Sequence, residues 1–224
     1  MKISKDSNIQ KIYSILEKEI KKYDAPVIEL IKVQHNDPFK ILIATILSAR
    51  TKDSTTALVS NKLFKKVKNF NDLKKIKESE LSKLIYPIGF YKTKAKNLKK
   101  LSIVIEKEFN NTIPETIEEL ILLPGVGRKT ANLVLSSAFN KQAICVDVHV
   151  HRILNRIGYI KTKSPLESEM ELRKKLPKKL WIKTNRIFVP YGQMLCKPIN
   201  PLCSQCKIYN YCERNNVKKK IKKG

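Results

Sequence analysis

Four of the five cysteines fall in one seventeen-residue segment, separated by six, two and five residues: Cys196, Cys203, Cys206 and Cys212. Grouped thiolates bind soft metals, and both a tetrahedral zinc ion and a [4Fe-4S] cluster accept four cysteine ligands. Structural zinc more often takes two Cys-x-x-Cys pairs, whereas only Cys203 and Cys206 form such a pair here. The longer outer spacings therefore favour a [4Fe-4S] cluster, with zinc as the alternative.

A glycine-rich turn offers a second kind of chemistry. Residues 123–129 read LPGVGRK and lie between two amphipathic stretches. Glycine leaves no side chain at the apex of such a turn, so backbone N–H groups can approach a phosphate closely, and the helix that follows adds its positive N-terminal end. We expect Gly125, Val126, Gly127 and Arg128 to bind an anion such as a DNA phosphate.

Lys129 falls in the first turn of the helix that follows this turn. In the simpler interpretation it makes one more phosphate contact. In the other interpretation it is a buried amine beside a positive helix end, where an amine loses its proton more easily and can attack carbon to form a Schiff base. The residues alone leave both interpretations open.

Asp147 immediately precedes an expected helix, and capping is the commonest role of aspartate at such a position. A carboxylate next to a cationic sugar intermediate could equally stabilise that intermediate, and capping would hold it in place. The two roles are compatible. The fifth cysteine, Cys145, stands apart and is expected to be a small buried apolar residue.

The elements that position these residues are predicted to be helices. Asp37 and Pro38 are typical of the N-cap and first turn of a buried helix that ends at Ser48, and Gly89 is expected to take a left-handed cap. Residues 144–150 alternate as a strand would, but a lone strand has no partner, so the fold class is all-α. Further helices are expected at 9–20, 53–64, 71–76, 79–86, 92–109, 114–123, 128–139, 148–156, 166–176 and 181–195.

The chain is strongly basic. Its 224 residues include 46 Lys and Arg against 20 Asp and Glu, a formal net charge of +26 at pH 7. This charge makes nucleic acid the default partner, although a lysine-biased composition is the plain alternative. The lysines of residues 92–100 are expected to face phosphates, and the lysine run at 218–223 is expected to be a solvated tail.

No stretch approaches the ~20 apolar residues that span a membrane, and the first residues lack the apolar core of an export signal. We therefore expect no membrane partner and a cytoplasmic, nucleoid-associated location in a prokaryote. Thiols stay reduced in that compartment, which disfavours disulfides among the grouped cysteines.

Together these motifs resemble the endonuclease III family, DNA glycosylases and abasic-site lyases of the helix-hairpin-helix glycosylase superfamily. The resemblance rests on residues 47–53, 89–95, 123–132 and 146–149, and on the spacing of the cysteines. It implies a six-helix domain at 30–140 that contains the hairpin, and a second helical domain from 1–29 and 141–224 with the [4Fe-4S] loop at 196–212. It also implies that a monomer binds double-stranded DNA in a cleft flanked by the two domains.

The resemblance implies a role for two residues in particular. The family's nucleophilic lysine matches Lys129, which would attack C1′ of a flipped, oxidised pyrimidine nucleotide, and its assisting aspartate matches Asp147. The resulting Schiff base would permit β-elimination, which cuts the strand 3′ to the lesion. A damaged pyrimidine has lost aromatic stacking, so its extrusion costs less than that of an intact base. The implied activity is that of a bifunctional base excision repair enzyme.

Three positions depart from the family pattern. Arg50 replaces a common glutamine in the loop expected to fill the gap left by the flipped nucleotide, where it could pair with the orphaned base. Phe90 replaces a common leucine and preserves an apolar wedge. Val148 replaces the usual threonine and so lacks a hydroxyl, while His149 is expected to line the pocket or support the structure rather than act as an acid or base.

Two mismatch-specific glycosylases of the same superfamily are the nearest rivals. Adenine-mismatch and thymine-mismatch enzymes lack a lysine at the position of Lys129, and the 12 residues after Cys212 are too few for the recognition domain of the adenine enzymes. A non-catalytic DNA-binding protein with a purely structural cluster is the alternative from a different class.

Overall fold

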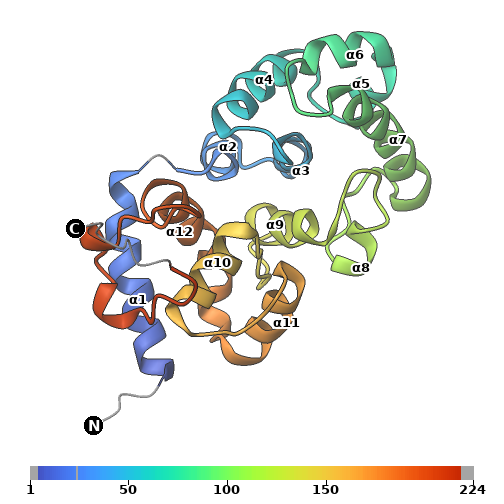
Figure 1. Ribbon diagram of the computed structural model, residues 1–224. Helices are drawn as coiled ribbons and strands as arrows, with labels where there is room; N and C mark the ends of the chain where they lie inside the picture. Colours follow the sequence, from blue (N-terminus) through green and yellow to red (C-terminus); the bar gives the residue numbers. More distant parts are fainter. Residues whose placement is uncertain (1–4, 24, 218–224) are drawn as a thin grey trace. The chain divides into compact units, whose positions relative to one another are not determined.

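The computed structural model describes residues 5–23 and 25–217, so the lysine run expected to form a tail lies outside the described residues. Every regular element within those ranges is helical, which confirms the all-α fold class (Figure 1). In this described part of the chain, no helix is both long enough and apolar enough to cross a membrane. The chain forms two compact units, residues 26–143 and residues 1–25 with 144–224.

The unit of residues 26–143 is organised around a helix that is buried on all sides, α3 (Pro38–Ser48). The Asp37 carboxylate accepts a hydrogen bond from the Phe39 backbone N–H at 2.9 Å and so caps this helix, as its sequence predicts. Every residue from Ile41 to Leu47 is buried, so the helix has no solvent-facing side. The other helices of this unit are α2 (Val27–His35), α4 (Asp53–Lys66), α5 (Phe70–Lys75), α6 (Glu78–Ile85), α7 (Tyr91–Phe109), α8 (Ile117–Leu120) and α9 (Arg128–Ala138).

The second unit combines the first helix of the chain with the last ones. In Figure 1 the blue α1 (Lys5–Glu19) lies beside α12 (Trp181–Met194), although the two are far apart in the sequence. The Tyr13 hydroxyl lies 2.8 Å from the Thr184 hydroxyl, and the Tyr13 ring packs edge-on against Phe188. This core also contains α10 (Val148–Ile157) and α11 (Pro165–Lys175), and the segment after α12 carries the 3-10 turns η3 (Cys203–Gln205) and η4 (Tyr209–Tyr211).

The structure differs from the sequence predictions at three places in the first unit, and the first is the helix expected at 114–123, which spans only Ile117–Leu120. The helix α2 was not predicted, because it follows Pro26 without a side-chain cap. The left-handed residue before α7 is Phe90, with φ 58°, and not Gly89 as predicted. In α4, Leu58 is 74% exposed, because the buried face of that helix runs through Thr56, Val59 and Leu63.

Candidate functional site

A tight turn joins α8 to α9 and exposes backbone between the two helices. Gly125 has φ 84°, a left-handed conformation that disfavours a side chain. The Val126 N–H donates to the Leu123 carbonyl at 3.0 Å, and the buried Val126 side chain anchors the turn. A Cβ at Gly125 would lie 3.3 Å from Asn97 of α7 and 3.6 Å from Ile46 of α3, so these two helices support the turn.

Gly127 is the N-cap residue of α9, and it has no side chain with which to cap the helix. Its φ of −97° and ψ of 173° lie in the extended region, which every residue type can adopt. A Cβ added there would meet no atom within 4 Å. Neither backbone strain nor packing within the described chain therefore requires glycine at this position. Open space at the positive end of a helix suits an anion that must approach the backbone closely.

Lys129 lies in the first turn of α9, and its side chain is exposed. The interpretation that places a buried amine here is therefore wrong for the protein by itself. The reason is helical periodicity, because Ala131 and Leu135 turn the buried face of α9 to the core while Lys129 lies on the opposite side. The positive end of the helix remains next to the amine.

Asp147 is the N-cap of α10 in the second unit, and only 8% of its surface is exposed. One carboxylate oxygen, Oδ1, accepts hydrogen bonds from the backbone N–H of His149 at 2.9 Å and of Val150 at 3.0 Å. The capping role predicted from the sequence is therefore confirmed. These two bonds also fix the direction of the carboxylate, which a role in electrostatic stabilisation requires.

His149 follows in the first turn of α10 and is half-buried. Its Nδ1 lies 3.1 Å from Nη2 of Arg152, and because a guanidinium group only donates, Nδ1 accepts this bond. Arg152 also donates to the Gly192 carbonyl at 3.0 Å and to the Cys196 carbonyl at 2.9 Å. A Cβ at Gly192 would lie 2.6 Å from the His149 ring, so glycine makes room for it. These contacts tie His149 to the segment that precedes the cysteines.

Arg50 and Phe90 are brought together, although each belongs to a different loop of the first unit. The Arg50 guanidinium carbon lies 5.5 Å from the centre of the Phe90 ring, and both side chains are exposed. Their φ angles of 54° and 58° are left-handed, a conformation that costs about 1–3 kcal/mol for residues with a Cβ. A Cβ at Gly89 would lie 2.6 Å from the Arg50 carbonyl oxygen, so only glycine permits this close approach of the two loops.

The lysine-rich run of α7 is not one surface. Lys92, Lys96 and Lys100 are exposed, whereas the side chains of Lys94 and Lys99 turn back onto backbone carbonyl groups. The expectation that the whole run faces phosphates is therefore wrong for these two lysines. Helical spacing explains the difference, because positions 92, 96 and 100 share one face of α7.

Lys94 makes buried contacts that were not predicted from the sequence. Its Nζ donates to the Leu47 carbonyl at 2.7 Å and to the Ala49 carbonyl at 2.6 Å, at the C-terminal end of α3. Burial lowers the pKa of Lys94 to about 8, so the amine remains largely protonated at neutral pH. The signal was present in the spacing, since Lys94 lies on the same stripe as the buried Leu98 and Leu101.

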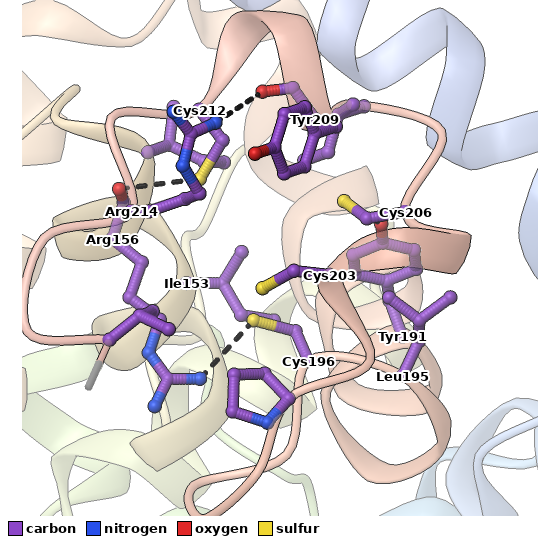
Figure 2. A pocket seen from close by; sticks show the side chains of 14 residues that line it. Ile153, Arg156, Tyr191, Leu195, Cys196, Cys203, Cys206, Tyr209, Cys212 and Arg214 are labelled. Carbon is purple, nitrogen blue, oxygen red and sulfur yellow. Dashed lines mark hydrogen bonds between the residues drawn. The ribbon is translucent and has the colours of Figure 1, made fainter. Parts of the chain in front are cut away.

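The four grouped cysteines line one pocket after α12, and all four are free thiols (Figure 2). The Cys196 sulfur accepts a hydrogen bond from Nη1 of Arg156 at 3.4 Å, and the Tyr191 hydroxyl lies 3.0 Å from the Cys206 sulfur. Burial raises the pKa of the Cys212 thiol to about 11. Among the described residues, no three Cys, His, Asp or Glu side chains converge on one ion-sized site.

The four thiols of this pocket are a donor set that both a zinc ion and a [4Fe-4S] cluster accept. A tetrahedral zinc ion needs four sulfurs within about 2.3 Å of one centre, whereas a [4Fe-4S] cube takes one thiolate at each of four separate corners. The Arg156 guanidinium at the edge of the pocket suits a centre that thiolates make negative. The separate Cys145 is 1% exposed, as expected for a small buried residue.

Comparison with known proteins places these features in a family. Residues 43–178 match the HhH-GPD superfamily of base excision DNA repair proteins. Endonuclease III of Thermotoga maritima is 45% identical over 180 residues, which cover 80% of this chain and 84% of that protein. The solved structure of a trapped endonuclease III–DNA covalent intermediate matches with a TM-score of 0.83 and 35% identity, over 95% of this chain and 97% of the other.

A thermostable thymine-DNA glycosylase has nearly the same fold, with a TM-score of 0.81, 26% identity, and coverage of 93% of this chain and 96% of the other. Backbone similarity alone therefore does not separate the two activities, whereas the identity over most of the chain does favour endonuclease III. The chain belongs to the HhH-GPD superfamily and, within it, to the endonuclease III family of base excision repair DNA glycosylases and abasic-site lyases.

Proposed function

We propose that the chain removes oxidised pyrimidines from double-stranded DNA and cuts abasic sites, with Lys129 as the nucleophile and Asp147 as the assisting carboxylate. The observation that carries this proposal is the place of Lys129, an exposed amine in the first turn of α9 beside an N-cap glycine with open space around it. A DNA backbone whose phosphate binds the N–H groups of this turn presents its sugars to that amine.

The reaction proceeds in two stages that one amine can serve. The neutral Nζ of Lys129 attacks C1′, the bond between C1′ and the base nitrogen breaks, and the base leaves with a proton. The ring oxygen takes up a proton as the sugar ring opens to an iminium ion, and the iminium acidifies the proton on C2′. Water accepts that proton, the C3′–O bond breaks, the phosphate leaves, and a further water hydrolyses the Schiff base.

Asp147 contributes through electrostatics. Positive charge develops on the sugar as the base leaves, and a carboxylate aimed by two backbone hydrogen bonds stabilises that charge without reorganising. His149, whose Nδ1 accepts from Arg152, supports the structure or lines the pocket rather than transferring a proton.

Four thiolates, those of Cys196, Cys203, Cys206 and Cys212, would hold a [4Fe-4S] cluster. When bound, the cluster joins four points of the segment after α12, whose only regular elements in the described residues are two short 3-10 turns, and it thereby stabilises that segment. Arg156 would donate to the sulfur of Cys196, and Tyr191 to that of Cys206. No step of the sugar chemistry passes through this group.

The remaining contacts would be made by a monomer with duplex DNA. Gly125, Val126, Gly127 and Arg128 would bind a phosphate near the lesion, while Arg50 and Phe90 would occupy the space that the extruded nucleotide leaves. Such an enzyme would work on the chromosome in the cytoplasm of a prokaryote.

Replacement of Gly127 by alanine is expected to weaken DNA binding about tenfold, because the added methyl group occupies the space through which a phosphate reaches the helix end. The same change is expected to cost about 1 kcal/mol of stability or less, since the φ of Gly127 suits alanine. Fluorescence anisotropy with a labelled abasic duplex, together with thermal unfolding, measures both effects. Unchanged affinity would place the phosphate elsewhere.

Replacement of Asp147 by asparagine is expected to slow single-turnover base excision about 100-fold, because an amide lacks the charge that stabilises the sugar cation. Asparagine also caps helices well, so the melting temperature is expected to change by only about 2–4 °C. An unchanged excision rate would confine Asp147 to the capping role that its hydrogen bonds already show.

Borohydride reduction tests the proposed function itself. The protein is incubated with a thymine-glycol duplex, an abasic duplex and an undamaged duplex, and sodium borohydride converts any Schiff base into a stable covalent complex. We expect a covalent complex with the first two and none with the third. DNA binding without any covalent complex would leave only a binding module.

A further inference from the structure

We propose that Lys94 is a positioning residue that holds Arg50 and Phe90 in the geometry with which they open the duplex at a lesion. The inference rests on the proposed function, because it concerns the extrusion of the nucleotide that precedes the attack by Lys129. It adds a residue whose side chain is itself almost fully buried.

The contacts of Lys94 join the two loops that carry this pair. Its Nζ donates to the carbonyl groups of Leu47 and Ala49 at 2.7 and 2.6 Å, and it lies 3.4 Å from the Thr51 hydroxyl. These three groups flank Arg50 on both sides. The backbone of Lys94 is fixed as well, because its N–H donates to the Phe90 carbonyl at 3.0 Å. One residue thus bonds to both loops.

The pair needs such support, because its geometry is not the one these residues would adopt alone. Arg50 and Phe90 are both left-handed and both exposed, so neither burial nor backbone preference holds them in place. The Gly89 N–H adds one more link, since it donates to the Thr51 hydroxyl at 3.1 Å. The ammonium group satisfies carbonyls that the end of α3 leaves without helical partners, which favours a cation there.

A second lysine of the same helix supplies a matched control. Lys99 also belongs to α7, and its Nζ donates to the carbonyl groups of Leu73 and Ile76 at 3.0 and 2.5 Å, where α5 ends. Neither Arg50 nor Phe90 is among the partners of Lys99. Lys94→Met and Lys99→Met therefore each remove one ammonium from the end of one helix. Only Lys94→Met removes contacts with the loop that carries Arg50.

The test compares two abasic substrates, one in a fully paired duplex and one inside a bubble of unpaired bases. Extrusion from the bubble needs no wedge, so borohydride trapping there reports the amine of Lys129 alone. For Lys94→Met we expect the trapping rate to fall about tenfold or more on the paired duplex and less than about twofold on the bubble. For Lys99→Met we expect the same small change on both substrates.

Each outcome decides the question. An equal fall of the trapping rate on both substrates would show that Lys94 only stabilises the fold, as Lys99 does. An unchanged rate on both substrates would show that Lys94 has no role in trapping. Both results would overturn the inference. Failure of the wild-type protein to trap either substrate would instead overturn the proposed function. Trapping of the paired duplex but not of the bubble by the wild type would also contradict the role assigned to the wedge.

A spectroscopic measurement keeps the inference testable if Lys94→Met does not fold. Thr51→Val removes the hydroxyl that both Lys94 and the Gly89 N–H contact, while it retains the shape of the side chain. A 2-aminopurine placed opposite a non-reactive abasic analogue reports whether the orphaned base is unstacked. We expect the fluorescence increase on binding to fall at least twofold in Thr51→Val at saturating protein. An increase equal to that of the wild type would contradict the proposed link.

Discussion

Replacement of Lys129 by glutamine is expected to abolish borohydride trapping and strand cleavage and to lower the single-turnover rate of base excision by about a thousandfold or more. An amide cannot attack C1′, and no other amine is placed in the first turn of α9 beside the uncapped glycine. Affinity for DNA is expected to change little, since at most one phosphate contact is lost. Gel analysis of borohydride-treated mixtures measures trapping, and anisotropy measures affinity.

Lys141→Gln is the matched control for the loss of one positive charge. Lys141 belongs to the same unit, and its Nζ forms an ion pair with Glu115 at 3.0 Å. We expect this variant to trap abasic DNA at the wild-type rate. Wild-type trapping by Lys129→Gln would show that another amine forms the Schiff base, whereas loss of trapping in both variants would point to charge rather than to a nucleophile.

Replacement of Cys206 by serine is expected to remove the iron and the acid-labile sulfide of the protein and to lower its melting temperature on the order of 10 °C. Binding of a structural metal group contributes directly to folding. The buried side chains of Ile208 and Tyr191 line the same pocket as the four cysteines. The wild-type protein is expected to carry about four iron and four sulfide per chain, as the composition of the cluster requires.

Cys145→Ala serves as the control for this experiment. Cys145 is 1% exposed and does not line the cysteine pocket, so its removal is expected to leave the iron content unchanged. Elemental analysis and a sulfide assay give both numbers for each variant. One zinc per chain without sulfide would overturn the cluster assignment, and retention of iron in Cys206→Ser would remove that cysteine from the ligand set.

The parts of the fold that local chemistry determines could be predicted from the sequence. The helix α3 starts where Asp37 and Pro38 predict, and α10 starts after the Asp147 cap and ends at Ile157, before the left-handed Gly158 with φ 87°. Each of these boundaries depends on a single side chain or on a glycine. The helix α2 lacks any such signal at its start, since Pro26 offers no side-chain cap, and it was missed.

The parts that depend on tertiary contact could not be predicted in this way. The sequence predicts a left-handed helix cap at Gly89, yet glycine is needed there because the Arg50 carbonyl approaches from another loop. The sequence predicts that Lys94 faces phosphates like its exposed neighbours. Its place on the apolar stripe of α7 instead buries it against the end of α3. One of the two interpretations of Lys129 requires a buried amine, and the packing of α9 excludes it because Lys129 is exposed. For Gly89 and Lys94 the deciding neighbour lies far away in the sequence, whereas the exposure of Lys129 follows from the apolar spacing of α9 itself.

The most direct test of the account identifies the atom that bonds to DNA. The borohydride-trapped complex with an abasic duplex is digested with protease and nuclease, and the modified peptide is sequenced by mass spectrometry. We expect a reduced sugar adduct on Nζ of Lys129 and on no other lysine. An adduct on a different lysine, or on the N-terminal amine, would contradict the central claim even if the protein cuts DNA efficiently.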